Sequence, residues 1–453
     1  MTDTMTSPDK QRLQDIAADL IERAIKAGAD AAEASVSESR NTELSVRDGK
    51  LEDIEGSESL DAGVRVFIGK QQAGVAFSDL SADGRAQSIE RAVAMARVAP
   101  EDPYSALAEA ERLCDNPPEI QLFDATVWSP QELEARAIEV EEAARAIDGV
   151  SMTDSAFASF GQGAAAYATS TGFNQGWRKS VFSYGASVIA EKDGAMERDY
   201  SATSARRPAD LRPTGEIGTE AGERTARRVG PRKIDSGTLP VVFDRRVAST
   251  FLSALCGAIS GPAVARGVSF LREKMGEAVF ADGITIHDEP HRDWGHGSAP
   301  FDGEGTVNRA SRIIDDGRLT TWFLNSAAAR QLKLAPTGHA RRSMGGPPGA
   351  GPTNLHLEAG AMSRDDLIGG MSDGIVVMEM FGPSLNSNTG DWSVGVSGYR
   401  IENGVMTYPV SEITVAGNLI EIFARLVPAS DLEFRGSINS PSVLVDAMSV
   451  GGL

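Results

Sequence analysis

Three of the five histidines lie in one short stretch with several carboxylates, which is the densest group of potential metal ligands in the chain. The candidate ligands are His287, His291, Asp293 and His296. Zinc accepts imidazole and carboxylate ligands, and the spacing of His287 and His291 would place both on one face of a helix. Pro290 lies inside that spacing and opposes a helix, so a solvated loop is expected. A metal site that makes the chain an independent metallohydrolase is the alternative.

A serine and a cysteine could in principle act as nucleophiles. Residues 370–374 match the G-x-S-x-G pattern of a nucleophile elbow, which requires a strand before the serine and a helix after it. Here a helix with Ser363 as its N-cap is expected before the motif and a strand after it, so we predict a helix-to-strand turn. Cys256 lies in an apolar helix expected over 247–259 without a close basic neighbour, which indicates a buried structural thiol.

Segment 344–352 is rich in glycine and proline. It lacks the Gly-Lys-Ser/Thr ending of a phosphate-binding loop, so nucleotide binding is not supported. A mobile surface connection and a loop that lines a substrate site both remain open for this segment.

Charge and length exclude several classes of protein. With 44 Lys plus Arg against 64 Asp plus Glu, the formal net charge is −20, which repels nucleic-acid phosphates and acidic membranes. We therefore expect no direct nucleic-acid binding. Two cysteines are too few for a disulfide framework, residues 1–12 lack an apolar signal core, and no run approaches the roughly 18 apolar residues of a membrane span. A cytoplasmic protein is expected.

The candidate functional residues belong to a chain of 453 residues, which is long enough to form two or more domains. Apolar spacing predicts helices over 9–27, 82–98 and 131–147, and a charged helix over 214–232. Alternating segments around the Asp48-Gly49 turn predict a hairpin. Further strands, separated by Gly and Asn turns, are expected over 151–159, 164–170 and 179–191. Helix plus antiparallel strands thus occurs twice.

An apolar strand over 239–243 opens the second half of the chain, in which Asn403-Gly404 marks a hairpin. The expected fold class is α+β, with a curved or barrel-like, mainly β C-terminal domain carrying short helices. The expected organisation is an N-terminal helix and antiparallel-sheet unit over 1–100, a connecting segment over 101–130, a central helix and meander unit over 131–235, and the C-terminal β-rich domain over 236–453.

Several strings resemble the PmbA/TldD family, and more closely its PmbA (TldE) branch. They are Gly-Pro-Thr-Asn-Leu at 351–355, Phe-Gly-Pro-Ser-Leu-Asn at 381–386, Asn-Thr-Gly-Asp-Trp-Ser at 388–393, Gly-Tyr-Arg-Ile-Glu-Asn-Gly at 398–404, Ala-Gly-Asn-Leu at 416–419, Gly-Ala-Asp-Ala-Ala-Glu at 28–33, Arg-Asp-Gly-Lys-Leu-Glu at 47–52 and Val-Gly-Gly at 450–452. The similarity runs through nearly the whole chain in the same order.

The resemblance implies a two-subunit peptidase in which the TldD branch binds zinc through a helical H-E-x-x-x-H motif and a later cysteine, with the glutamate as general base. When Pro240-Val241-Val242 is aligned with the family's strand before that helix, Ser253, Ala254 and Ala258 stand where the family has His, Glu and His. None of the three can bind zinc as required, and Cys256 is the last cysteine. The resemblance therefore implies no cofactor in this chain, zinc in the partner subunit, and no catalysis by this chain alone.

The resemblance also implies a groove, at the contact between the two subunit types, that takes an extended, unfolded peptide by pairing with a sheet edge. Polar side chains are the candidates for lining this groove or the subunit contact: Asn354, Asn386, Ser387, Asn388, Thr389 and Asp391. Ordinary turn chemistry is the other interpretation of the 386–391 run.

The main hypothesis is a metal-free partner subunit of a cytoplasmic TldD/TldE-type zinc metallopeptidase that helps bind unfolded peptides for limited proteolysis. Its partner would be a TldD-type zinc-bearing subunit in a heterodimer, with a homodimer when the chain is alone. A non-enzymatic, peptide-binding homodimer is a further alternative. The family is also known as a modulator of DNA gyrase, but the charge of −20 favours an indirect effect through proteins.

Overall fold

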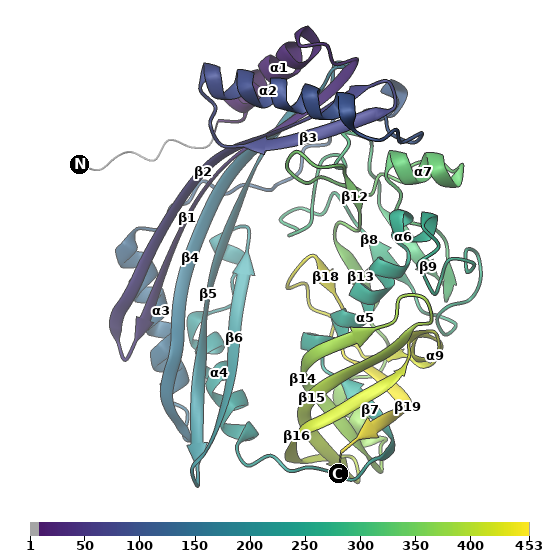
Figure 1. The fold of residues 1–453 in the computed structure, drawn as a ribbon. Coiled ribbons are helices and arrows are strands. Elements are labelled where there is room, and N and C mark those ends of the chain that lie inside the picture. Colours follow the sequence, from purple (N-terminus) through teal and green to yellow (C-terminus); the bar gives the residue numbers. More distant parts are fainter. Residues whose placement is uncertain (1–8, 453) are drawn as a thin grey trace.

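The structure, a computed structural model, describes residues 9–452, so most of the polar stretch 1–12 lies outside the described part. Its N-terminal unit is a long, bent sheet with helices on one face, and its C-terminal unit stands opposite the other face of that sheet (Figure 1). No helix within residues 9–452 combines the length and the apolar character needed to cross a membrane.

The N-terminal unit contains six strands in the order β3-β2-β1-β4-β5-β6, all antiparallel. Its elements are α1 (Lys10–Lys26), β1 (Ala31–Arg47), β2 (Lys50–Ile68), β3 (Gln71–Phe77), α2 (Ala82–Val98), α3 (Pro130–Arg145), β4 (Val150–Thr169), β5 (Asn174–Lys192), β6 (Ala195–Ala205) and α4 (Thr214–Arg228), with short 3-10 turns at Ala110–Arg112 and Pro208–Asp210. Strands from both expected helix and sheet units therefore pair within one continuous sheet.

The helices start and pack where the sequence predicts. Asp9 caps α1 by accepting hydrogen bonds from the amides of Gln11 and Arg12, and Ser129 forms a capping box with Glu132 at the start of α3. Residues spaced three or four apart on α1 are buried against the sheet: Leu13, Ala17, Leu20 and Ala24. The predicted helices over 9–27, 82–98, 131–147 and 214–232 are thus confirmed, with ends shifted by a few residues.

Side chains along the strands alternate between the two faces of the sheet. Even-numbered residues of β1, β4 and β5 lie under the four helices, as Ala34, Ala166 and Phe182 do in the hydrophobic cores. Odd-numbered residues therefore point to the opposite face, toward the C-terminal unit, as Glu33 and Tyr167 do. The many alanines on the helix-facing side leave room for helices to approach the backbone closely.

One expectation about the strands was wrong. The segments 151–159 and 164–170 are not two strands with a turn between them but parts of the single strand β4. Gly161 and Gly163 lie inside β4 opposite β1, where a Cβ atom would lie 2.2 Å from Asn41 Oδ1 and 2.9 Å from Glu38 O, respectively. These glycines permit a close approach between strands and do not form a turn.

The C-terminal unit begins with β7, as the sequence predicts. Its elements are β7 (Gly237–Phe243), α5 (Arg245–Ala258), α6 (Gly261–Ala265), β8 (Ile286–Asp288), β9 (Ser311–Asp315), β10 (Arg318–Leu319), α7 (Ser326–Leu332), β11 (Ala340–Arg341), β12 (Gly349–Ala350), β13 (Leu355–Leu357), α8 (Arg364–Gly369), β14 (Asp373–Leu385), β15 (Asp391–Glu402), β16 (Val405–Asn418), α9 (Leu419–Arg425), β17 (Val427–Pro428), β18 (Ile438–Asn439) and β19 (Val443–Gly451). The expected α+β class is confirmed.

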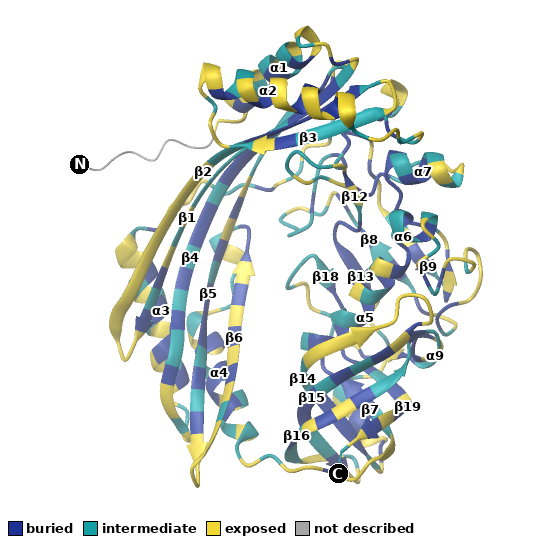
Figure 2. Cartoon of the chain, in the orientation of Figure 1, coloured by how far each residue is buried: buried dark blue, intermediate teal, exposed yellow. Residues whose placement is uncertain are grey.

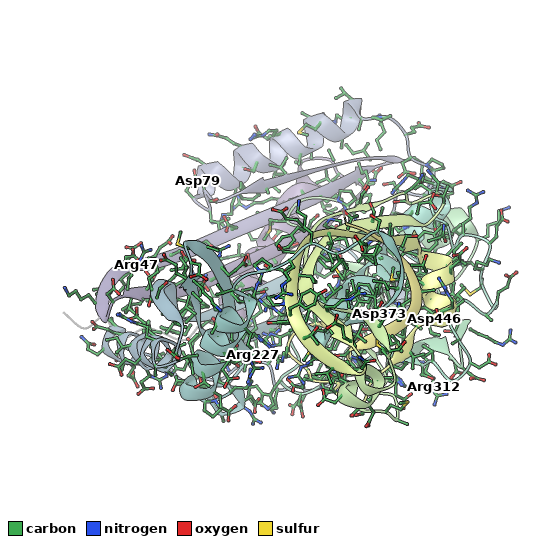
Figure 3. All side chains as sticks on the ribbon, turned by 90° about the horizontal axis from the view of Figure 1, so that it is seen from below. Arg47, Asp79, Arg227, Arg312, Asp373 and Asp446 are labelled. Atoms are coloured by element: carbon green, nitrogen blue, oxygen red, sulfur yellow. The ribbon has the colours of Figure 1, made fainter. Side chains whose placement is uncertain are left out.

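The strands β16, β15, β14, β7 and β19 form a closed barrel, because β19 pairs with both β7 and β16. Viewed from below, these strands curve into a ring, and the exposed Asp446 of β19 lies on its outside (Figure 3). The predicted Asn403-Gly404 turn joins β15 to β16, with both residues at positive φ. Segment 370–374 is the predicted turn between α8 and β14.

The glycine- and proline-rich segment 344–352 joins the two units. A Cβ atom on Gly63 of β2 would lie 2.3 Å from Gly345 N, and one on Gly74 of β3 would lie 1.6 Å from Gly345 O. Three glycines therefore allow the backbone of this loop to contact the backbone of the N-terminal sheet. The tip of the loop therefore forms a contact between the two units. Neither interpretation of the sequence, a mobile surface connection or a loop that lines a substrate site, included such a contact.

Candidate functional site

The positions that replace the zinc motif all lie on α5. Ser253 is exposed, and its hydroxyl donates to Ser249 O of its own helix at 3.1 Å, whereas Ala254 is partly buried and Ala258 is buried in the C-terminal core. An alanine methyl group provides no lone pair for a metal, so this helix face does not fit zinc. Within residues 9–452, no group of three or more His, Cys, Asp or Glu side chains is arranged to hold a metal ion.

Cys256, also on α5, lies close to a buried acid. Burial raises the pKa of the Cys256 thiol, Asp288 raises it further, and Arg341 offsets part of the rise. The thiol is therefore protonated at neutral pH and is a poor nucleophile. Cys256 is partly buried against the C-terminal core, whereas the sequence indicates a buried thiol. Asp288 in turn accepts hydrogen bonds from the amide and hydroxyl of Thr353 and lies 3.4 Å from His339 Nε2.

A cavity of about 290 Å³ lies between the concave face of the N-terminal sheet and the loops of the C-terminal unit. We call it the sheet cavity. It is lined by Tyr167, Trp177 and Lys179 from the sheet and by residues 299–303, 338–342, Gly351 and Thr353. Arg341 on its wall is the residue that interacts with Cys256, so the cavity adjoins α5.

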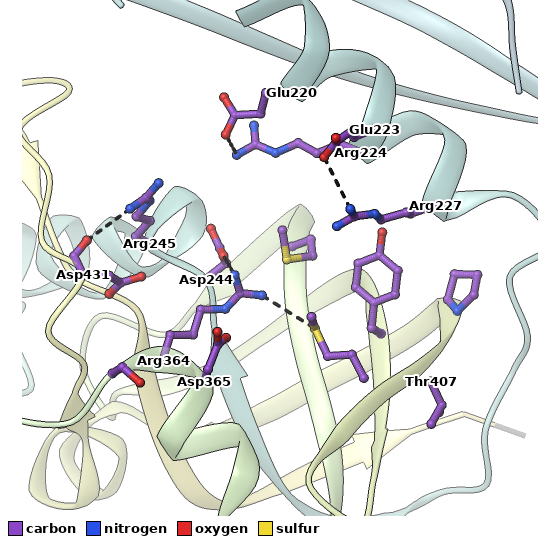
Figure 4. A pocket seen from close by; sticks show the side chains of 15 residues that line it. Glu220, Glu223, Arg224, Arg227, Asp244, Arg245, Arg364, Asp365, Thr407 and Asp431 are labelled. Carbon is purple, nitrogen blue, oxygen red and sulfur yellow. Dashed lines mark hydrogen bonds and ion pairs between the residues drawn. The ribbon is translucent and has the colours of Figure 1, made fainter. Parts of the chain in front are cut away.

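A larger cavity of about 700 Å³ lies between α4 and the barrel (Figure 4), and we call it the helix cavity. Its charged residues are largely paired: Arg224 with Glu220 at 2.5 Å, Arg227 with Glu223 at 3.4 Å, Arg364 with Asp244 at 3.2 Å, and Arg245 with Glu433. It touches α5 at the N-terminal turn and does not include the positions of the zinc motif. We favour the sheet cavity as the candidate site because it adjoins the part of α5 that carries the positions of the zinc motif, whereas the larger helix cavity does not.

The structure does not bring the four candidate ligands of the histidine cluster together around one point. His287 stacks on His356 with ring centroids 5.0 Å apart, and His291 Nε2 lies 2.7 Å from Asn308 Oδ1. Asp293 Oδ1 accepts from the Gln121 amide at 2.9 Å, and His296 Nε2 lies 3.1 Å from Ser204 O.

The loop that carries these residues fastens the C-terminal unit to β6 and to the connecting segment. Arg206, directly after β6, donates to the carbonyls of Gly295 at 2.9 Å and His296 at 2.6 Å. The amide of Trp294 donates to Gln121 O at 2.8 Å. The polar residues that cluster in this part of the sequence do lie in one loop, but in the structure this loop makes a contact between the two units and not a metal site.

Asn354 is 2% exposed and lies behind this loop. Its amide group donates to Glu289 O and to Ser298 Oγ, each at 2.7 Å, while its carbonyl oxygen accepts from the Gly297 amide at 2.8 Å. The side chain therefore uses its hydrogen-bonding groups to fix the shape of the loop, and it lies away from solvent.

The other groove candidates form the exposed turn between β14 and β15. Asn386 Oδ1 accepts from the Asn388 amide at 3.0 Å, and Asp391 accepts from Thr389 Oγ1 at 2.6 Å and from Asn418 Nδ2 at 3.0 Å. These hydrogen bonds lower the pKa of Asp391. Ser387 is exposed in the same turn. The turn lies beside the start of α9, because the amide of Leu419 donates to Gly390 O.

One feature that the sequence did not indicate is the edge strand β6. Among residues 9–452, β6 pairs with β5 on one side and with no strand on the other. That open side faces the C-terminal unit (Figure 1), and alternate β6 residues are exposed (Figure 2). An unpaired strand edge can pair with an extended peptide through main-chain hydrogen bonds.

Comparison with known proteins shows similarity over nearly the whole chain. Models of the PmbA/TldA metallopeptidase match in three parts: domain 1 over 32–96, the central domain over 124–229 and the C-terminal domain over 236–452. The chain is 34% identical to the Metalloprotease PmbA of Escherichia coli O157:H7, over 93% of this chain and 92% of that protein. It is 31% identical to a Metalloprotease PmbA homolog of Haemophilus influenzae, over 98% and 97% of the two chains.

Solved structures show the same fold. A protein from Bacteroides thetaiotaomicron described as a modulator of DNA gyrase superposes with a TM-score of 0.88 at 29% identity, covering 97% of this chain and 99% of that one. TldE from Thermococcus kodakarensis has a TM-score of 0.83 at 19% identity, covering 96% of this chain and 100% of that one, a likeness in fold alone.

Proposed function

Because this chain belongs to the PmbA/TldD metallopeptidase family, we propose that it is the metal-free partner subunit of a TldD/TldE-type peptidase. In this role it pairs with a zinc-bearing TldD-type subunit and helps hold unfolded peptides for limited proteolysis in the cytoplasm. Catalysis then requires the partner, which supplies the zinc and the general base.

The observation that carries this proposal is that the chain has all three parts of the family fold but no metal-binding side chains at the zinc-motif positions of α5. The family models cover all three parts of the chain, yet Ser253, Ala254 and Ala258 offer no ligand set. A zinc peptidase needs at least three protein ligands and a water at the metal. A chain that keeps the scaffold without the donor set is suited to binding and positioning.

Peptide holding is supported by the open edge of β6 and by the sheet cavity, which both lie between the two units. Pairing with a strand edge uses main-chain groups, so it tolerates many peptide sequences. That tolerance is what a subunit acting on unfolded chains needs.

The test is to purify the full-length chain and its TldD-type partner separately, measure zinc in each by inductively coupled plasma mass spectrometry, and assay cleavage of an unstructured peptide. We expect zinc only in the partner and cleavage only in the mixture. Ser253→Ala serves as a control that should leave cleavage by the mixture unchanged, since this hydroxyl bonds only within its own helix.

One zinc per chain in this protein, or cleavage by this chain alone, would overturn the proposal. Native co-purification provides an independent check, because a heterodimer should yield the TldD-type subunit. Recovery of the chain only as a homodimer would instead favour a non-enzymatic peptide-binding protein.

A further inference from the structure

The open edge of β6 is free at some residues and occupied at others. Tyr200 and Ser204 both make main-chain hydrogen bonds to side chains outside β5, which shows that their N–H and C=O groups point away from β5. These groups alternate in direction along an antiparallel edge strand, so those of Ala202, midway between the two, point outward as well. All three residues are exposed. Their contacts therefore determine where a peptide can pair.

Charged side chains close the edge at Tyr200. Its amide donates to Asp199 Oδ1 at 2.7 Å, and its carbonyl oxygen accepts from Arg224 Nη1 at 3.5 Å. Asp199 is 4% exposed and lies 3.1 Å from Arg228 Nη1 and 2.6 Å from Nη1 of Arg246, which belongs to α5. A peptide strand that reached Tyr200 would break this buried network, which is costly. Pairing should therefore stop before Tyr200.

At Ser204 a single side chain occupies the edge. His296 Nε2 lies 3.1 Å from Ser204 O. A carbonyl oxygen only accepts, so the ring donates from Nε2. Burial lowers the pKa of His296, and the ring is therefore uncharged at neutral pH. The contact is a neutral hydrogen bond, which is weaker than the charged network at Tyr200.

Between these two positions the main chain of Ala202 is free. None of residues 9–452 makes a hydrogen bond to its N–H or its C=O. In an antiparallel pair, two residues that face each other exchange two main-chain hydrogen bonds. A peptide can therefore form two bonds at Ala202 without displacing any group. It gains two more at Ser204 once the His296 ring leaves the carbonyl.

The His296 ring has room to leave. A cavity of about 200 Å³, which we call the loop cavity, adjoins this end of β6, and its lining includes Ser204, Ala205, Arg292, Trp294, His296 and Phe434. The main chain of the loop is held separately, because Arg206 donates to the carbonyls of Gly295 and His296. Rotation about the side-chain bonds of His296 therefore frees Ser204 O without moving the loop.

We propose that an extended peptide pairs with Ala202 and Ser204 at the edge of β6, and that the His296 ring competes with this peptide for the Ser204 carbonyl. This inference rests on the proposed peptide-holding function and adds the regulation of that site. The edge offers main-chain groups at these positions, so the occupant is any extended chain with free main-chain N–H groups. The ring keeps the edge closed at Ser204 until such a chain replaces it.

The experiment measures binding of a fluorescein-labelled ten-residue peptide, rich in Gly, Ser and Ala, to the full-length chain by fluorescence anisotropy. His296→Ala removes the competing donor and should tighten binding about threefold to tenfold, because binding no longer breaks a neutral hydrogen bond. His296→Gln keeps an N–H donor at the end of the side chain and should bind like the wild type. His291→Ala is the matched control in the same loop, since its ring contacts Asn308 and not β6.

A second peptide tests whether the gain comes from main-chain pairing. The same sequence methylated at every main-chain nitrogen has no N–H to donate to Ser204 O, so the wild type and His296→Ala should bind it equally. In the wild type, the unmethylated peptide should slow hydrogen exchange at the Ala202 amide, measured by mass spectrometry. This measurement needs no variant, and thermal unfolding checks that each variant folds.

Binding by the wild type with no gain in His296→Ala would overturn the competition and leave peptide holding intact. The same conclusion follows from an equal gain in His296→Gln or His291→Ala, or from a gain that persists with the methylated peptide. Unchanged exchange at Ala202 with peptide bound would overturn the pairing at β6. Absence of binding to the wild type and to every variant would instead contradict the peptide-holding function on which this inference rests.

Discussion

Glu33 of β1 and Arg342 of the C-terminal unit are 309 residues apart in the sequence, yet Arg342 Nη1 donates to Glu33 Oε1 at 2.5 Å. Arg65 Nε donates to the same oxygen at 2.7 Å, and Tyr167 Oη donates to Oε2 at 2.8 Å. Glu33 is 2% exposed. A buried carboxylate on the concave face of the sheet thus binds one guanidinium from each unit.

Removing the charge of Glu33 should destabilise the protein. Glu33→Gln leaves the buried guanidiniums of Arg65 and Arg342 without a counter-ion, a change that costs about 3–5 kcal/mol in comparable buried pairs. Urea denaturation followed by far-ultraviolet circular dichroism measures the loss. As a control, Glu58→Gln removes an exposed carboxylate on β2 whose contact with Arg40 is 3.6 Å long, and it should change little. Equal effects of the two substitutions would contradict the structural role of Glu33.

The same group predicts how stability depends on pH. Burial by itself raises the pKa of Glu33, but Arg342 and Arg65 outweigh burial and hold the pKa at about 2, below the usual 4.5. A carboxylate with a lowered folded-state pKa contributes its stabilisation fully above the unfolded pKa. That contribution should therefore decline as the pH falls from about 4.5 toward 2. Denaturation midpoints of the wild type and Glu33→Gln should converge over this window, and a constant difference between them would argue against the linkage.

The contact between Gly63 of β2 and Gly345 of the C-terminal unit can be tested by substitutions on β2. Gly63→Ala places a methyl group 2.3 Å from Gly345 N, so the loop must move away from β2, at a cost of about 1–3 kcal/mol. Gly56→Ala on the same strand meets no atom within 4 Å and is the matched control. Trypsin should cut faster after Arg341 and Arg342 in the Gly63 variant, which mass spectrometry of the fragments detects. Unchanged cleavage would show that the loop is not held at this point.

Two substitutions in and behind the histidine-rich loop should have different effects. His291→Ala removes a ring bonded to Asn308 and should leave metal content and cleavage by the two-subunit mixture unchanged. Asn354→Ala leaves the Gly297 amide and the Glu289 carbonyl without their partner and should cost about 1–3 kcal/mol. Thermal unfolding and metal analysis of both variants provide the test. Loss of bound metal in His291→Ala would revive the independent metallohydrolase.

Local patterns predicted local structure well in this chain. The apolar spacing and caps of α1 and α3, and the Asn403-Gly404 turn, depend on residues within a few positions of one another. The same logic failed at Gly161 and Gly163, because a glycine in a turn and a glycine that admits a neighbouring strand look alike in one sequence. The groove role of Asn354 and of residues 386–391 stays a prediction.

By itself, the sequence determined the family, the α+β class and the absence of ligand side chains at Ser253, Ala254 and Ala258, because these follow from residue identity and short-range spacing. Only the tertiary structure decided which residues meet across the two units. Glu33 reaches Arg342, Arg206 fastens the histidine-rich loop, and Lys179 shares a cavity with Arg341. These contacts depend on strand register and on the packing of distant segments, and no local pattern encodes either of them.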